Sequence, residues 1–294
     1  MKHVPVTLAL FAALAFAGGA EARWRHHDST RTHGDSQITR CSDWHVEFDD
    51  RDATIAEEHL TIRPNEAAPL VASPSENGGI TVIGSDGPDF EIAACKAAPD
   101  DEAALLGRIH LVRHGGTISV EGPENDEWTA HLIIRAPKSS SVQIETHNGP
   151  VSLSRFQGKA SVRSENGPVS LFASAGDIDV RTTNGPISVE GGAGRIRVHA
   201  QNGPLSVNLQ GTAWNGGELE GRTQNGPVHL GIADDYASGV FVESAGHSPF
   251  RCSGSPCRNA RRNWDDRHKS IAFGAENASV RLSTENGPVS IGAN

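Results

Sequence analysis

The sequence predicts an all-β protein, specifically a β-solenoid of stacked 18-residue coils that each contain two short strands. Three observations predict it: a hexapeptide that recurs in phase, apolar–polar alternation on both sides of it, and a composition rich in glycine and poor in aromatic residues. The alternative architecture is a β-sandwich of hairpins. The fixed 18-residue step favours the solenoid over that alternative.

The recurring hexapeptide reads Asn-Gly-Pro-apolar-x-apolar. Its six copies start at Asn148, Asn166, Asn184, Asn202, Asn225 and Asn286. The first three steps share the 18-residue length, a 23-residue step and a 61-residue step follow, and a degenerate early copy starts at Asn77. Asn-Gly supplies the positive-φ backbone of a tight turn, and the proline begins a strand where a missing N–H donor matters least. Stacked asparagines would form a ladder of amide hydrogen bonds.

Each 18-residue unit contains two runs of alternating apolar and polar residues. One run follows the proline, as in residues 151–153, and the other precedes the next asparagine, as in residues 160–162. A period of two indicates strands with one buried face, and the frequent glycine and proline exclude helices here. A second glycine, at Gly158, Gly176 and Gly194, marks the other turn. One unit cannot bury its own apolar face, so the units stack about 4.8 Å apart.

Composition limits the kind of protein further. The chain has 32 glycines, one methionine, one tyrosine and only 5% aromatic residues, so it cannot fill one wide globular core and suits thin layers of valine, isoleucine and leucine. Its net charge of −10 argues against a nucleic-acid partner, which requires a basic field.

The first residues have the pattern of a secretory signal peptide. Lys2 precedes a short apolar stretch, and a small-residue Ala-x-Ala site ends at Ala22. The stretch is shorter than the roughly 20 residues that span a bilayer, and no cysteine follows it for lipid attachment. We therefore expect residues 1–22 to be removed and the mature protein to be periplasmic or extracellular, without a transmembrane anchor. Residues 23–40 are predicted to form a flexible, His-rich tail.

The rest of the chain divides into two parts by regularity. We expect irregular β coils or a cap in residues 41–140. We expect the regular solenoid in residues 141–294, with an inserted loop region at about 232–277. In the first part, strands are expected at 60–62, 80–82, 109–111, 118–120 and 132–134, with one helix near 100–106.

The four cysteines are Cys41, Cys95, Cys252 and Cys257. An even number in an exported chain indicates disulfides. Cys252 and Cys257 lie in a short loop that can close on itself, which leaves Cys41 and Cys95 to pair. Free thiols and a zinc site are the alternatives, and the scattered spacing disfavours zinc.

One outward-facing column is basic. The position three residues before the asparagine holds Arg163, Arg181, His199 and Arg222 in successive units. Stacked like charges repel unless something compensates them. Two kinds of compensation remain open at this point: nearby acids, namely Glu165, Asp179 and Glu220, or a bound anionic polymer. We call this column the basic stripe.

The sequence predicts no catalytic residue, no cofactor and no structural metal. The acid pairs at 49–50, 100–101, 234–235 and 265–266 fall outside the repetitive strands, whereas cleavage of a glycosidic bond needs clustered carboxylates or a metal. The turns lack the aspartate of calcium-binding β-rolls, and the 14 histidines supply no fixed ligand shell.

The successive copies of Thr-x-Asn-Gly-Pro-Val-Ser-Leu, together with the early Gly79-Ile80-Thr81-Val82, resemble a bacterial family of exported β-strand-repeat proteins. Its members are called "putative adhesins" and contain a domain of unknown function. The resemblance covers about residues 75–292 and implies a solenoid-like fold and a cell-envelope setting. It brings no catalytic motif. The chain departs from the family in its Cys252–Cys257 loop and its His-rich start.

We therefore predict a non-catalytic envelope or secreted protein, an adhesin-like or scaffold module. It presents a repetitive β face to a glycan, such as envelope polysaccharide, or to a surface protein. The alternative is an exported carbohydrate-active lyase or hydrolase on a β-helix. Oligomeric state is not predicted from the sequence.

Overall fold

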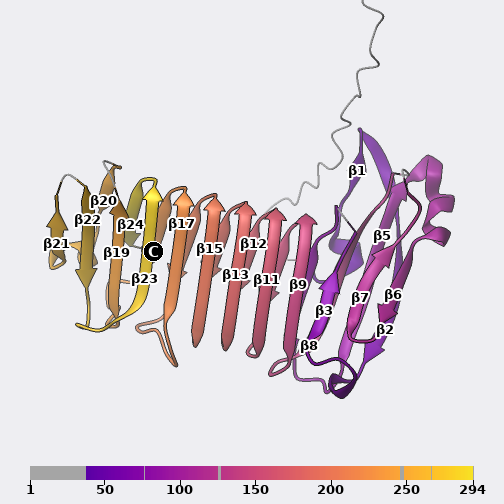
Figure 1. Cartoon of the computed structure of the whole chain (residues 1–294), viewed down its shortest axis with the longest axis horizontal. Helices are drawn as coiled ribbons and strands as arrows, with labels where there is room; N and C mark the ends of the chain where they lie inside the picture. The colour runs from indigo at the N-terminus through magenta and orange to yellow at the C-terminus, as the bar shows by residue number, and fades with distance from the viewer. Residues whose placement is uncertain (1–37, 76, 125–126, 246–247, 266, 294) are drawn as a thin grey trace, which may run out of the picture.

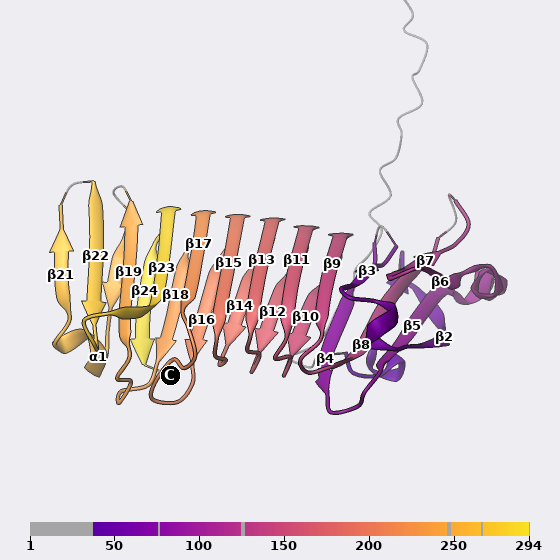
Figure 2. The same ribbon diagram turned by 60° about the horizontal axis from the view of Figure 1, so that its bottom comes forward.

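The chain forms two large β-sheets that face each other along an elongated molecule (Figures 1 and 2). The structure is a computed structural model that describes residues 38–75, 77–124, 127–245, 248–265 and 267–293. The expected signal peptide and most of the expected His-rich tail lie outside the described residues. Within them, the all-β class predicted from the sequence is observed.

Among the described residues, the first sheet contains twelve strands. In spatial order they are β1 (Glu47–Phe48), β2 (Arg51–Ile62), β5 (Phe90–Pro99), β8 (Thr129–Pro137), β4 (Ile80–Ser85), β10 (Val151–Ser154), β12 (Val169–Phe172), β14 (Ile187–Glu190), β16 (Leu205–Leu209), β18 (Val228–Ile232), β24 (Val289–Ala293) and β20 (Phe250–Cys252).

The second sheet also contains twelve strands within the described part of the chain. In spatial order they are β21 (Arg261–Trp264), β22 (His268–Phe273), β19 (Gly239–Ala245), β23 (Ala278–Asn286), β17 (Leu219–Asn225), β15 (Arg195–Asn202), β13 (Asp177–Asn184), β11 (Lys159–Asn166), β9 (Ser141–Asn148), β3 (Leu70–Ser73), β7 (Thr117–Glu121) and β6 (His110–His114). The helical segments are short: the 3-10 helices η1 (Cys41–Asp43), η2 (Pro64–Glu66) and η3 (Asp100–Arg108), and the α-helix α1 (Ser255–Arg258).

Each regular unit sends one strand to each sheet, and equivalent strands pair in parallel. In the first sheet, Val169 lies beside Val151 on one side and Ile187 on the other, so each residue is aligned with its counterpart in the next copy of the repeat. The second sheet has the same register, with rows such as Ala160, Ile178, Ile196 and Leu219. This pairing is what a solenoid requires. The two sheets keep open edges, which is also compatible with the sandwich alternative.

The N-terminal part has a less regular topology. The strands β2, β5 and β8 pair antiparallel, and β4 then lies between β8 and β10 although β8 follows it in the chain. In the second sheet, β3 likewise lies between β7 and β9. The early repeat copy that starts at Asn77 therefore stacks directly against the first regular unit.

The main apolar core lies between the two sheets. The first residue of each post-proline strand and its i+2 neighbour point inward, and Leu153, Ile187 and Leu205 are fully buried. A separate apolar cluster covers the outer face of the first sheet near β5 and β8, where Trp44 and Phe48 pack against Ile133. Residues 38–48 thus cover part of the first sheet from outside, and we call them the covering segment.

The segment between β18 and β23 extends both sheets beyond the regular units. β19 pairs in parallel with β23 in the second sheet, and β22 and β21 continue that sheet antiparallel. β20 pairs with β24 in the first sheet. At this end of the molecule, β20 and β21 are therefore the edge strands (Figure 1).

Candidate functional site

The repeat asparagines form one continuous ladder along the molecule. Each side-chain amide nitrogen donates a hydrogen bond to the amide oxygen of the preceding asparagine, at distances of 2.9–3.1 Å. The seven members are Asn77, Asn148, Asn166, Asn184, Asn202, Asn225 and Asn286. The ladder therefore crosses the 23-residue and 61-residue steps without a break, and the early copy belongs to it.

The glycine after the ladder asparagine is required for space. A Cβ on Gly185 would lie 2.1 Å from the carbonyl oxygen of Gly167, and a Cβ on Gly167 would lie 2.2 Å from that of Gly149. Gly149, Gly167 and Gly185 lie outside the left-handed region of φ, which corrects the expectation from the Asn-Gly pair at these three positions, whereas Gly203 at the equivalent position has a φ of 158°. At the other turn, Gly176 (107°) and Gly194 (83°) have a positive φ.

The four residues of the basic stripe lie side by side on neighbouring strands of the second sheet. Arg181 is aligned with Arg163 on one side and His199 on the other, and Arg222 follows His199. Glu145 occupies the same row on β9. The row therefore carries one acid, two arginines, one histidine and a third arginine.

Each arginine of the stripe forms an ion pair with one carboxylate. The pairs are Arg163 with Glu145 (Nη1–Oε1, 3.9 Å), Arg181 with Asp179 (Nε–Oδ1, 3.0 Å) and Arg222 with Glu285. Of the three acids expected to compensate the stripe, only Asp179 does so directly. Glu165 lies 3.8 Å from His147 and Glu220 lies 3.7 Å from Arg197.

His199 contributes little positive charge at neutral pH. Burial lowers the pKa of its imidazole, and the neighbouring Arg222 and Arg181 lower that pKa further. The protonated form loses hydration and faces two cations, so the neutral form is favoured. The charge of the stripe therefore comes from its three arginines.

An open hollow of about 460 Å³ lies against the stripe. Its lining includes Arg163, Arg181 and His199, together with Glu145 and Glu165, and the remaining groups are hydroxyls, amides and one further imidazole. The hollow thus offers charged and neutral donors and acceptors with no large apolar side chain. Such a lining suits a polar, hydroxyl-rich ligand better than an apolar one.

The acid pairs predicted to lie in loops are on separate elements of the fold. Asp49 and Asp50 occupy the turn between β1 and β2, and Asp100 and Asp101 begin η3. Asp234 and Asp235 follow β18, and Asp265 follows β21. Among the described residues, no group of three or more His, Cys, Asp or Glu side chains is placed to hold a metal ion.

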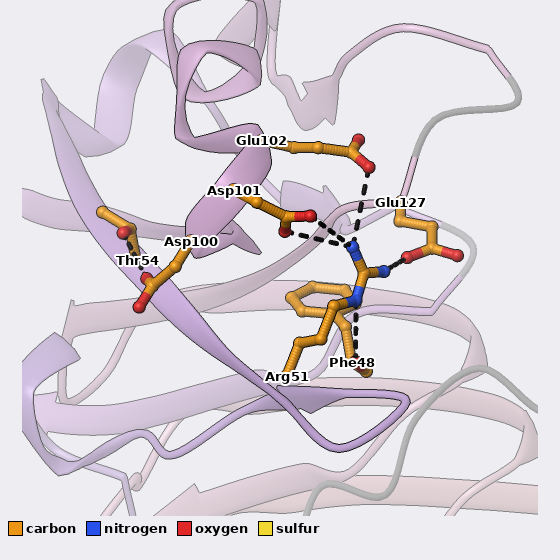
Figure 3. Close-up of polar contacts among 7 residues, drawn as sticks. All are labelled: Phe48, Arg51, Thr54, Asp100, Asp101, Glu102 and Glu127. Atoms are coloured by element: carbon orange, nitrogen blue, oxygen red, sulfur yellow. Dashed lines mark hydrogen bonds and ion pairs between the residues drawn. The ribbon is translucent and has the colours of Figure 1, made fainter.

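A polar cluster that the sequence did not indicate surrounds Arg51 on β2 (Figure 3). Its guanidinium lies 3.1 Å from Asp101 Oδ1 and 3.6 Å from Glu102 Oε1, and it also pairs with Glu127. Its Nε donates to the backbone carbonyl of Phe48. One positive charge therefore faces three carboxylates. Local spacing carries no signal for this cluster, because the acids come from elements that are distant from β2 in the sequence.

Both expected cysteine pairs are disulfide-bonded in the structure. The Cys41–Cys95 disulfide joins η1 to β5 and attaches the covering segment to the outer face of the first sheet. His131 is buried beneath the same segment, with Nε2 2.9 Å from Thr81 Oγ1 and its ring 5.9 Å from that of Trp44. Burial lowers the pKa of His131 to about 4.

No pattern in the sequence singles out His131. It occupies an outward position of β8, where a polar residue normally meets water, and only the covering segment makes that position buried.

In the described ranges, no helix is both long enough and apolar enough to cross a membrane.

Neither a protein-family model nor a curated protein matches the chain. Among solved structures, a "putative cell adhesion protein" from Clostridium sporogenes aligns at 10% identity and a TM-score of 0.31, covering 82% of this chain and 100% of that chain. A "putative adhesin" from Bacteroides fragilis aligns at 10% identity and a TM-score of 0.30, covering 82% and 97%. A "putative lipid binding protein" from Parabacteroides distasonis aligns at 12% identity and a TM-score of 0.23, covering 80% and 97%.

Two of these names agree with the resemblance to the "putative adhesin" family that the repeats suggest.

Proposed function

We propose that this chain is a non-catalytic, adhesin-like or scaffold protein of the cell envelope or the secreted fraction. It presents the outer face of a two-sheet β-solenoid to a glycan or a surface protein. The observation that carries the proposal is the unbroken in-register stack, in which seven asparagines and four stripe positions each repeat along one line. Such a surface offers the same groups at a regular interval to a repetitive partner.

The basic stripe and the hollow beside it are the proposed contact site. The three arginine side chains are between 53% and 63% exposed, and their ion pairs are at the surface. Exposed ion pairs contribute at most about 1 kcal/mol, so a polyanion can replace the intramolecular carboxylates at low cost. Envelope polysaccharide with regularly spaced acidic groups therefore fits the stripe.

The proposed setting is an oxidising compartment outside the cytoplasm. Two disulfides are typical of exported proteins, and they support the export that the pattern of residues 1–22 suggests. We also propose that the protein performs no catalysis. The dispersal of its acidic pairs among separate turns and ends of strands supports this absence.

The test is a binding screen against purified envelope polysaccharides and immobilised glycans, with the protein expressed as the full chain. A variant with Arg163→Glu, Arg181→Glu and Arg222→Glu is compared with the wild type. A matched control reverses Arg155, Lys159 and Arg195, which lie at the opposite turn of the coils. We expect saturable binding by the wild type and the control, and at least about a tenfold weaker affinity for the stripe variant.

Equal binding by all three proteins would remove the stripe from the site, and binding by none would contradict the glycan partner. Analysis of the sugar products in the same samples tests the absence of catalysis. Shortened or unsaturated oligosaccharides would favour the carbohydrate-active alternative.

A further inference from the structure

Charge is distributed unevenly along the chain. Residues 41–130 contain 19 acidic and 5 basic side chains, whereas residues 131–294 contain 14 acidic and 16 basic ones. The first group builds one end of the elongated molecule, where β1 and β6 are the edge strands of the two sheets (Figure 1). At the opposite end lie β20, β21 and β22. The molecule is therefore electrostatically asymmetric along its long axis.

The end formed by β20, α1 and β21 is basic. Between residues 250 and 269 the sequence has six arginines and lysines and two acids. Arg251, Arg258, Arg261 and Arg262 are exposed, and none of them forms an ion pair with a described residue. The arginines of the stripe, by contrast, each have a carboxylate partner. Positive charge at this end is thus left without compensation among the described residues. We call it the basic end.

The basic end also carries exposed aromatic surface. Trp264 is 50% exposed, which is the largest value among the large apolar residues of the described chain. Its ring lies 6.1 Å from that of Phe250, on the edge strand of the other sheet, and Arg262 lies 5.7 Å from its centroid. Tryptophan and arginine are enriched in protein interfaces and among the residues that dominate binding there. The exposed tryptophan beside arginine therefore indicates that the basic end is a surface for binding another macromolecule.

The opposite end, called here the acidic end, has the complementary character. Glu47 on β1 lies directly opposite Asp52 on β2, both are exposed, and neither forms an ion pair with a described residue. Directly opposed like charges destabilise a strand pair. The one base of this hairpin, Arg51, is already held by three carboxylates (Figure 3). Negative charge is therefore in excess there.

We propose that the basic end of one copy binds the acidic end of another, so that the protein associates head to tail. Both surfaces belong to the same chain, carry opposite charge and lie at opposite ends. A contact of this kind is heterologous and leaves one free end of each type, so further copies can add. Linear assembly would lengthen the repetitive β face and multiply weak contacts with a polymeric partner. Association of this kind is independent of the identity of that partner.

The experiment measures the mass and length of the full chain in solution, by sedimentation velocity and small-angle X-ray scattering, at increasing protein concentration. We expect assemblies whose length grows by whole molecules at constant cross-section. They should dissociate as salt rises from about 20 mM to about 200 mM, because the Debye length falls below about 10 Å. Arg251→Glu with Arg261→Glu, and separately Glu47→Lys with Asp52→Lys, should each weaken association at least about tenfold.

Mixing the two charge-reversed variants provides the decisive control. Each variant alone has lost the positive excess of its basic end or the exposed acid pair of its acidic end. In the mixture, the unchanged acidic end of one variant meets the unchanged basic end of the other, and the two reversed ends are again of opposite charge at the substituted positions, so association should return to near the wild-type level. The variant Arg155→Glu with Lys159→Glu makes the same change in charge away from both ends and should associate like the wild type. Circular dichroism establishes that each variant is folded.

Head-to-tail association is overturned if the wild type stays monomeric at low salt, or if the folded variants do not rescue each other. If the monomeric wild type binds vesicles that contain anionic lipid, the basic end is a lipid-binding surface and head-to-tail association is likewise overturned.

Discussion

The regular coils, residues 141–232, and the N-terminal part, residues 38–137, achieve stability in different ways. In the coils, each strand lies beside its equivalent from the next copy of the repeat, and the buried polar side chains are hydroxyls. In the N-terminal part, strands pair antiparallel, a disulfide fixes an outer cover, and Lys96 and His131 are buried. In the coils, many equivalent strand contacts each contribute to stability. In the N-terminal part, stability depends more on individual groups, namely the disulfide and the buried polar side chains.

Loss of the Cys41–Cys95 disulfide should have the largest effect. The bond closes a separation of 54 residues, and loop-closure entropy then predicts a loss of about 4 kcal/mol when both cysteines become alanine. The matched control removes Cys252 and Cys257, which are separated by 5 residues, and should cost about 2 kcal/mol. Urea unfolding monitored by tryptophan fluorescence measures both. A larger loss of unfolding free energy in the control would contradict the role given to the disulfide of the covering segment.

Acid should also act first on the N-terminal part. The pKa of His131 is about 4 in the fold and near 6.5 in the unfolded chain. Because the unfolded state binds the proton more readily, stability is complete above about pH 6.5 and declines as the pH falls towards 4. The expected loss over this range is about 3 kcal/mol. His131→Gln should lose correspondingly less stability between pH 7.5 and pH 4 in the same urea assay, and equal losses would refute the assignment.

A change at a coil turn tests whether the coils depend on close approach. Gly185→Ala would place a Cβ 2.1 Å from the Gly167 carbonyl oxygen, so we expect a loss of about 1–3 kcal/mol. Gly107→Ala is the control, because a Cβ there meets nothing within 4 Å. Thermal unfolding of the two variants should differ clearly. Equal melting temperatures would show that the coils are spaced more widely than described.

The smallest effect is expected at the asparagine ladder, which is exposed to water. Asn184→Ala removes one donated and one accepted amide hydrogen bond, for about 1 kcal/mol. Asn286 donates to Asn225 at the end of the ladder, and Asn286→Ala should cost about half as much. A larger loss at Asn286 would mean that the ladder is not uniform along the molecule.

Much of the fold could be predicted from local patterns. The repeat and its alternation located the strands of the coils, and short apolar runs located parts of β2, β4, β7 and β8 in the N-terminal part. The stripe residues also align as their spacing predicts. Periodicity is sufficient here because each neighbour in space is the next copy in sequence.

The remaining features depend on contacts that local sequence does not encode. The placement of β4 between β8 and β10, and of β3 between β7 and β9, reverses chain order. The burial of His131 depends on a segment that is distant in sequence, and Arg51 gathers carboxylates from η3 and from the chain before β8. The acids that pair with Arg163 and Arg222 belong to neighbouring strands, so only the register identifies them.

The central claim is that each coil lies in register against the next copy of the repeat, and a cysteine cross-link tests it most directly. Ser188 and Ser206 are exposed and aligned on neighbouring strands, so their Cα atoms are about 4.8 Å apart, within the range that a disulfide bridges. Ser170 and Ser206 are two coils apart, at about 9.6 Å. Under mild oxidation, Ser188→Cys with Ser206→Cys should form a disulfide that mass spectrometry locates, while Ser170→Cys with Ser206→Cys should not. Equal cross-linking of both pairs, or of neither, would contradict the stack.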